Sequence, residues 1–274
     1  MQLTQDHLSF YETHGYLFLP ECFSKPEVRV LKDELNSVFA EDTERRVLEK
    51  DKAVVRSVYG THATNEVFNR LSRHPKIVQP AMAILDNNVY VYQFKINAKA
   101  GFGGDVWQWH QDYIFWLKED GLPTDRVTTA VIFLNDVNRF NAPMFLIPGS
   151  HKDGVIDVMA NQRSEGGPYG ESPAWISNLT ADLKYGLSNE IISDLVSRYG
   201  IFSAEGPSGS LLFFHSNLVH GSTINISPFD RSIVLASYSS IDNVPCPIKN
   251  PRPEFLVSRN CDPIVPLGDD ALFV

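Results

Sequence analysis

The chain has 274 residues, of which 43% are hydrophobic and 21% charged, and its formal net charge is -9. This composition is typical of a folded, enzyme-sized protein and excludes a largely disordered chain. The acidic balance, without a cluster of lysine and arginine, disfavours nucleic acid and anionic membranes as partners and favours a small molecule.

Features of secretion or membrane insertion are lacking. The sequence shows no basic leader followed by an apolar run, and no stretch of about 20 apolar residues that could span a bilayer. The three cysteines, Cys22, Cys246 and Cys261, are far apart, which is typical of free thiols in a reducing compartment. We therefore expect a cytoplasmic protein, either a monomer or a homodimer.

The first 80 residues predict a helical support layer. Apolar residues recur at helical spacing between residues 4 and 49, and the apolar run 15–19 interrupts them. Thr4 and Ser24 suit N-cap positions, and Pro26 suits the first turn of the second helix. The predicted order is helix, short strand, helix.

After residue 80 the sequence predicts several antiparallel strands. Short runs rich in Val, Ile, Tyr and Phe occupy residues 89–97, 128–134, 144–147, 209–215 and 231–238.

Longer irregular stretches complete the chain. Residues 153 to about 173 lack periodicity and exceed ordinary loop length, and residues 153–186 are a possible lid insertion. Helical spacing resumes over residues 187–199, and the proline-rich stretch 245–266 predicts an extended wrap. No repeat or linker composition divides the chain, so residues 1–274 are expected to form one domain.

A His-x-Asp pattern at His110 and Asp112 is the first candidate for metal binding. On a strand, residues two apart face the same side. A second copy at His151 and Asp153 follows a turn sequence, so the pattern alone is weak. The first copy lies among aromatic residues, which suit a dry pocket for a reactive metal centre. A hydrophobic core strand with one hydrogen-bonded histidine remains the alternative interpretation.

The third ligand should come from a distant strand, and His220 competes with His215 for this role. Arg231 follows His220 after a turn, and a hairpin would place the two across from each other. A guanidinium there could bind the distal carboxylate of a dicarboxylate chelated to the metal. His215 has no such partner, so His220 is the preferred ligand. A surface charge remains the alternative for Arg231.

Four motifs extend this pattern. They are QFKIN at residues 93–97, WHQD at 109–112, NAPMFLIPGSH at 141–151, and HGS at 220–222 followed by Arg231. Together they resemble the phytanoyl-CoA dioxygenase family over nearly the whole chain. The resemblance implies a mainly β fold with flanking helices, the double-stranded β-helix or jelly-roll barrel of cupin-like enzymes. It implies iron(II) on His110, Asp112 and His220, with 2-oxoglutarate on Arg231 and O2 as the oxidant.

Within the family, the stretches 101–104 and 116–123 look most like the ectoine hydroxylases and related bacterial hydroxylases of free amino acids. Ectoine hydroxylases carry serine where Gln111 stands and histidine where Leu117 stands. Related halogenases lack the carboxylate that Asp112 supplies, so its presence indicates hydroxylation rather than chlorination.

Further binding residues are expected around this core. Gln93, Lys95 and Asn97 share one face of their strand. That face is either exposed to solvent or turned inward to bind an oxo acid or a zwitterion. The remaining candidates are Ser222 for the co-substrate carboxylate, Trp116 as a pocket wall, and Tyr169 and Trp175 as lid contacts.

The sequence thus predicts an iron(II)- and 2-oxoglutarate-dependent hydroxylase of a free amino acid or a small cyclic relative, releasing succinate and CO2. A terpenoid, an alkaloid or an acyl-CoA is the alternative substrate. Outside the oxygenases, a metal-binding cupin-like protein or a zinc hydrolase would use the same three ligands, but a zinc hydrolase would not need Arg231.

Overall fold

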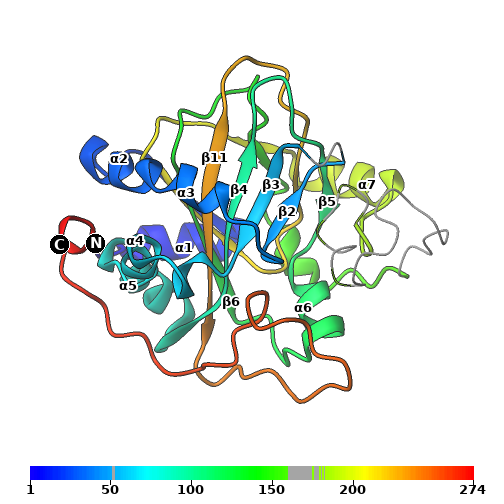
Figure 1. Ribbon diagram of the computed structural model, residues 1–274. Coiled ribbons are helices and arrows are strands. Elements are labelled where there is room, and N and C mark those ends of the chain that lie inside the picture. The colour runs from blue at the N-terminus through cyan, green and yellow to red at the C-terminus, as the bar shows by residue number, and fades with distance from the viewer. Residues whose placement is uncertain (51–52, 160–174, 176–178, 180, 182) are drawn as a thin grey trace.

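The computed structural model describes residues 1–50, 53–159, 175, 179, 181 and 183–274. Two antiparallel sheets form its centre (Figure 1). Within the described residues, the large sheet has the order β1-β9-β6-β11-β4-β3-β2, and the small sheet has the order β5-β10-β7-β8. The strands are β1 Tyr16–Leu19, β2 Arg46–Leu48, β3 Val55–Tyr59, β4 Val89–Lys99, β5 Trp107–His110, β6 Val127–Phe133, β7 Met144–Leu146, β8 Phe202–Ala204, β9 Leu211–His215, β10 His220–Ser222 and β11 Arg231–Ser240.

Helices flank the sheets on both sides (Figure 1). The α-helices are α1 Gln5–His14, α2 Lys25–Asp33, α3 Leu35–Ala40, α4 Glu66–Ser72, α5 Pro75–Leu85, α6 Tyr113–Asp120 and α7 Asn189–Tyr199. Short 3-10 turns occupy Thr61–Ala63, Ser150–Asp153 and Ala271–Phe273. No helix in the part of the chain that the structure describes is both long and apolar enough to cross a membrane.

The N-terminal layer contains the predicted helices and short strand, with two differences. Thr4 and Ser24 accept hydrogen bonds from backbone N–H groups in the first turns of α1 and α2, and each belongs to a capping box. The expected second helix breaks at Glu34 into α2 and α3. The first 80 residues also supply β1, β2 and β3, so they extend the large sheet as well as covering it.

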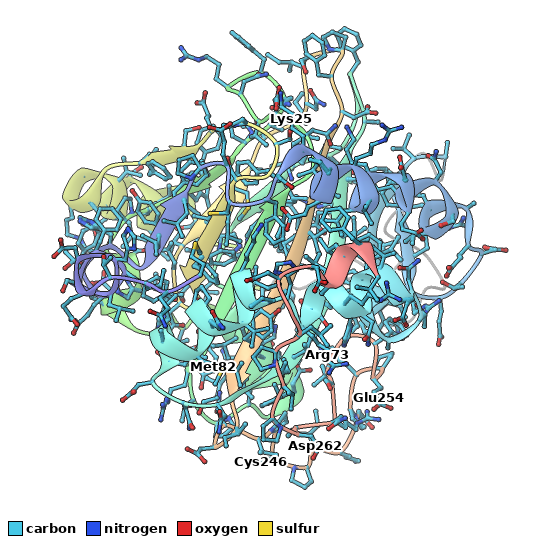
Figure 2. The ribbon with its side chains drawn as sticks, turned by 90° about the vertical axis from the view of Figure 1, so that its left-hand side faces the viewer. Lys25, Arg73, Met82, Cys246, Glu254 and Asp262 are labelled. Atoms are coloured by element: carbon cyan, nitrogen blue, oxygen red, sulfur yellow. The ribbon has the colours of Figure 1, made fainter. Side chains whose placement is uncertain are left out.

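The helices α4 and α5 pack on the outer face of the large sheet. Figure 2 shows them in front of its strands, with Arg73 and Met82 labelled. Phe94 and Ile96 of β4 belong to the core cluster on this side, together with buried residues of these helices. A continuous apolar layer therefore fixes β4 from behind.

The other face of β4 turns into the space between the two sheets. Lys95 pairs with Leu235, and Asn97 pairs with Ile233, on the neighbouring strand β11. Residues directly opposite in a ladder share a face. Leu235 and Ile233 pack in one cluster with residues of β7 in the small sheet, such as Met144. The polar face of β4 is therefore the inward one, which decides between the two interpretations that the sequence left open.

This pair of facing antiparallel sheets with flanking helices is the jelly-roll architecture that the sequence predicted. After β11, residues 241–270 contain no helix or strand and run along the edge of the molecule, as the orange to red trace in Figure 1 shows. The stretch predicted as an extended wrap lies within this segment.

Candidate active site

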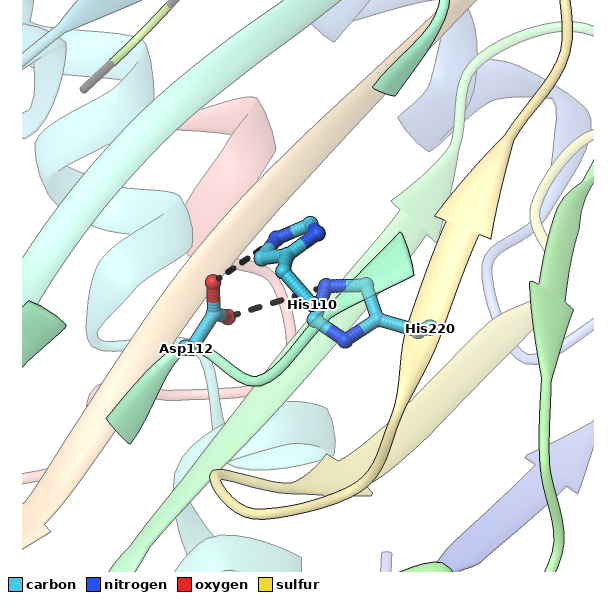
Figure 3. A group of neighbouring side chains, drawn as sticks. All are labelled: His110, Asp112 and His220. Atoms are coloured by element: carbon cyan, nitrogen blue, oxygen red, sulfur yellow. Dashed lines mark ion pairs between the residues drawn. The ribbon is translucent and has the colours of Figure 1, made fainter. Parts of the chain in front are cut away.

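Two histidines and an aspartate meet where β5 lies beside β10. His110, the last residue of β5, pairs with His220, the first residue of β10. Asp112 directly precedes α6. One donor atom from each side chain lies within 4.8 Å of the others. Asp112 Oδ1 is 3.5 Å from His110 Nε2, and Asp112 Oδ2 is 3.9 Å from His220 Nε2 (Figure 3).

The expectation that His110 and Asp112 share a strand is wrong. Asp112 has helical dihedral angles, φ -70° and ψ -39°, and the aromatic residues after it form α6 instead of a core strand. Tyr113, Ile114, Phe115 and Trp116 are all buried. A short run that is apolar throughout gives no periodicity with which to distinguish a buried helix from a buried strand.

Backbone carbonyls fix the orientation of both imidazole rings. His110 Nδ1 lies 2.6 Å from the carbonyl oxygen of Gln108, and His220 Nδ1 lies 2.9 Å from that of Leu218. A carbonyl oxygen can only accept, so each Nδ1 carries the proton and donates it. The Nε2 lone pairs are left directed toward Asp112. Two imidazole nitrogens and one carboxylate are the donor set of facial iron(II) sites, so these residues fit the metal that the sequence predicts.

The electrostatics of the cluster favour the protonation states that a metal needs. Burial opposes ionisation of Asp112, but Lys95, His220 and His110 outweigh it and hold the pKa of this carboxyl well below its usual range. Burial, reinforced by the nearby His110, lowers the pKa of His220 to about 4. A carboxylate and a neutral imidazole are therefore present at neutral pH.

One cavity connects the histidines to Arg231. Its lining includes Lys95, Asn97, Trp107, His110, Met144, His220, Ser222 and Arg231. Arg231 Nε and Nη2 both donate to the carbonyl oxygen of Ala142, at 3.0 and 2.7 Å. Ala142 has a left-handed φ of 62°, which is unusual for a residue with a side chain. The guanidinium is held by one edge, and Nη1 makes no hydrogen bond to a described residue.

Arg231 reaches this cavity by a different route from the predicted one. It does not form a hairpin with His220; it pairs with Lys99 on β4, in the large sheet, whereas His220 lies in the small sheet. The two side chains approach the same cavity from opposite walls of the barrel. Residues 223–230 cross from one sheet to the other, a change of sheet that strand spacing alone does not reveal.

The sequence interpretation missed two buried basic side chains near Arg231. Arg56 and Lys99 are each 1% exposed. Arg56 pairs with the buried Glu49 at 3.2 Å, and its guanidinium carbon lies 3.8 Å from the ring centroid of Trp107. Burial, together with Arg231 and Arg56, lowers the pKa of Lys99 to about 6. Lys99 continues the alternation of Lys95 and Asn97, so the same strand pattern could have identified it.

The remaining candidates on β4 separate into two environments. Lys95 and Asn97 line the cavity, and Asn97 Oδ1 is buried without a hydrogen-bond partner. Gln93 is not among the lining residues; its Nε2 donates to the carbonyl oxygen of Leu256 at 2.9 Å.

The candidates from other elements also differ in placement. Ser222 lines the cavity. Trp116 does not; it is buried and packs edge-on against Tyr92, with ring centroids 5.0 Å apart. Trp175 packs edge-on against Phe255 at 5.4 Å, while Tyr169 lies outside the described residues.

The rejected histidines lie elsewhere. His151 and His215 contact each other, with ring centroids 5.2 Å apart, and His151 Nε2 is 3.1 Å from the carbonyl oxygen of Glu12. Neither belongs to the metal-binding group found among the described residues. Its contact with the backbone of α1 accounts for the position of the His151 ring.

Comparisons with known proteins agree with this geometry. The family model for phytanoyl-CoA dioxygenase (PhyH) matches residues 11–233. An L-proline trans-4-hydroxylase from Streptomyces griseoviridis is 37% identical, over 96% of this chain and 95% of its own length. An ectoine dioxygenase from Bordetella bronchiseptica is 34% identical, over 94% of this chain and 83% of its own length.

A solved structure shares the fold. The crystal structure of EctD from S. alaskensis with 2-oxoglutarate and 5-hydroxyectoine superimposes with a TM-score of 0.78 at 27% identity, covering 94% of this chain and 84% of that one. The predicted jelly-roll fold and the predicted branch of relatives are both confirmed.

Proposed function

The chain belongs to the phytanoyl-CoA dioxygenase family and is an iron(II)- and 2-oxoglutarate-dependent dioxygenase, and we propose that it hydroxylates a free amino acid or a cyclic amino-acid derivative. We infer that His110, Asp112 and His220 bind the iron and that Arg231 binds the far carboxylate of 2-oxoglutarate. The observation that carries this assignment is the single cavity that joins both histidines to Arg231.

The ligand side chains are already oriented for metal coordination. The carbonyl oxygens of Gln108 and Leu218 fix the two rings, so no reorientation is needed when Nε2 coordinates. Asp112 contributes the negative charge that a divalent cation requires. When bound, iron(II) and 2-oxoglutarate supply the activation of O2 and the transfer of one oxygen atom to a C–H bond, with release of succinate and CO2.

The far end of the cavity, at Arg231, suits a carboxylate. Burial, together with Arg231 and Arg56, lowers the pKa of Lys99, and burial together with Arg56 lowers the pKa of Arg231. Glu49 is the buried carboxylate that pairs with Arg56. A carboxylate beside Arg231 would relieve this repulsion and accept hydrogen bonds from Nη1, which has no partner among the described residues. Ser222 and Asn97 offer further polar contacts from the cavity wall.

The substrate is proposed from the relatives and from the wall beside His110. The relatives are named as a hydroxylase of L-proline and a dioxygenase of ectoine, and both of these compounds are small and cyclic. Phe115 lies edge-on against His110 at 6.2 Å, and Tyr185 lies edge-on against Phe115 at 5.0 Å. Aromatic rings packed against a metal ligand exclude water, and a substrate bound beside them would be suited by an apolar ring. The three free cysteines support the further proposal of a cytoplasmic location.

The assignment is tested by anaerobic titration of metal-free protein with iron(II) and 2-oxoglutarate. We expect the visible charge-transfer band of the iron chelate of the oxo acid. L-proline, ectoine and other amino acids are then screened under air by succinate release, and products are examined by mass spectrometry for one added oxygen atom. Bound iron without the band would contradict the co-substrate assignment. A band without succinate release from any amino acid would contradict the substrate class.

A further inference from the structure

Two glutamines flank the metal-ligand candidate His110, and each hydrogen-bonds to one of two short segments between β7 and α7, which we call stems. The first stem is residues 154–156, and the second stem is residues 183–187; both are within the described part of the chain. We propose that Gln108 and Gln111 are positioning residues, which hold these two stems beside His110 and thereby tune substrate binding without affecting the co-substrate. This inference rests on the proposed function.

Gln111 uses its whole side-chain amide for this purpose. Its Nε2 donates to the carbonyl oxygens of Gly154 and Asn217, at 2.8 and 2.7 Å, and its Oε1 accepts from the backbone N–H of Ile156 at 2.8 Å. The residue is 1% exposed. Asn217 lies in the turn that leads to His220, so one amide joins the first stem to both segments that carry the metal ligands. Loss of this side chain would remove a hydrogen-bond partner from three backbone groups, of which the Asn217 carbonyl is buried and the other two are partly buried.

Gln108 has two separate tasks. Its carbonyl oxygen accepts from His110 Nδ1, while its side-chain Oε1 accepts from the backbone N–H of Leu183 at 3.0 Å. The backbone N–H of Leu187 donates to the carbonyl oxygen of Trp109 at 2.9 Å, so the second stem is attached to β5 at two points. The residue that orients the metal-binding ring therefore also places the second stem.

The second stem contributes directly to the wall beside the metal. Tyr185 contacts Phe115 edge-on, and its hydroxyl donates to Glu119 Oε1 of α6 at 2.7 Å. Phe115 in turn lies against His110. A displaced stem would shift Tyr185 and Phe115 together, which changes the shape of the side on which we place the substrate.

The co-substrate end does not depend on the stems. The cavity that contains Arg231 is lined from β4, β5, β7, β10 and β11, and no residue of either stem is among its lining residues. Loosening a stem should therefore leave the binding of 2-oxoglutarate unchanged. This separation distinguishes a positioning role from a general loss of structure.

The test compares Gln108→Met and Gln111→Met, which keep the length of the side chain but not its hydrogen bonds, with Gln108→Glu, which keeps an acceptor for the Leu183 N–H. Hydrogen–deuterium exchange of metal-free protein reports on the amides of Leu183 and Ile156. We expect exchange at the affected amide to accelerate roughly threefold to tenfold in each Met variant, as loss of one hydrogen bond implies. Gln108→Glu should restore the slow exchange at Leu183.

The kinetic readout uses whichever of L-proline and ectoine releases more succinate as the probe substrate. We expect its KM to rise roughly fivefold to tenfold in the Met variants, for the same loss of hydrogen bonding, while the 2-oxoglutarate affinity measured from the anaerobic band stays unchanged. Faster exchange with an unchanged substrate KM, or equal losses for both ligands, would overturn the inference. If neither probe substrate is turned over, two results would still overturn the inference. One is amide exchange that is no faster in the Met variants than in the wild type, and the other is weaker 2-oxoglutarate binding in those variants, measured from the anaerobic band. Absence of the band in the wild type would instead count against the proposed function.

Discussion

Replacement of Arg231 by methionine tests the co-substrate site most directly. The side chain is 2% exposed, and two of its nitrogens are already engaged by Ala142. Methionine fills much of the same volume but offers no donor and no charge. The variant therefore removes the cation that we place against the far carboxylate of 2-oxoglutarate and leaves the metal ligands in position.

The size of the effect follows from the buried setting. Removal of one partner from a buried, hydrogen-bonded charge pair costs about 2–5 kcal/mol, and a middle value of about 3–4 kcal/mol corresponds to a rise in Kd of roughly 100-fold to 1,000-fold. Arg231→Lys keeps the charge but loses the planar fork, so a rise of roughly 10-fold to 30-fold is expected. The Ala142 carbonyl oxygen loses its donors in the Met variant, which lowers the free energy of unfolding by about 1–3 kcal/mol.

The assay is anaerobic titration of the iron-loaded protein with 2-oxoglutarate, with the chelate band as the signal. Arg29→Met is the matched control, because the Arg29 side chain is 83% exposed on α2. Iron binding should be equal in the variants and the wild type. A Kd that rises less than about tenfold in Arg231→Met would refute the placement of the carboxylate at this arginine.

Three other perturbations probe the metal site and the fold. Asp112→Asn removes the anionic ligand and should weaken iron(II) binding at least about 100-fold in a competition titration with a chelator. Asp120→Asn breaks the buried pair with Arg252, whose Nε and Nη2 lie 2.6 and 2.5 Å from its carboxylate oxygens; a cost of about 3–5 kcal/mol lowers Tm by roughly 6–15 °C. Burial lowers the pKa of His62 from 6.5 to about 4. The unfolded chain therefore binds the extra proton between these values, and stability falls as pH drops through them; His62→Gln should reduce this slope by up to one proton in urea unfolding.

Each of these three predictions has a control variant or a result that would contradict it. Iron binding that is unchanged in Asp112→Asn would remove this residue from the ligand set. The exposed Asp33, paired with Arg29 on α2, gives the control Asp33→Asn, which should leave Tm within about 2 °C of the wild type. An unchanged slope in His62→Gln would show that the imidazole titrates alike in the folded and unfolded chain.

The sequence predicted the chemistry of the site better than its local structure. His110, Asp112 and His220 meet as expected, although Asp112 begins a helix instead of continuing a strand. The two-residue spacing brought the ligands together through a turn, which local pattern cannot distinguish from an alternating strand. Alternation along β4 correctly grouped Lys95 and Asn97, because a strand with one apolar face toward helices has a strict period of two.

Residues whose role depends on distant contacts could not be found in this way. Arg56 pairs with Glu49, donates to the carbonyl oxygens of Val106 and Leu179, and contacts the ring of Trp107. Only the fold brings these groups together, so a single arginine in a short strand carries no local signal. Gln108 and Gln111 are similar, because their partners lie 43 to 106 residues away.

The surroundings of Arg56 bear on how this region unfolds. Its guanidinium is enclosed by the chain before β3, the chain before β5 and the Leu179 carbonyl, stretches that are far apart in sequence. If one of them detached alone, the buried guanidinium would lose some of the hydrogen bonds and charge pairing that offset its burial. This loss is unfavourable in free energy. The chain before β3 and the chain before β5 should therefore open together, as one cooperative unit. Trp107 contacts Arg56 and also lines the cavity that we assign to 2-oxoglutarate. This cavity should therefore be either fully formed or unfolded, with little population of partly open forms.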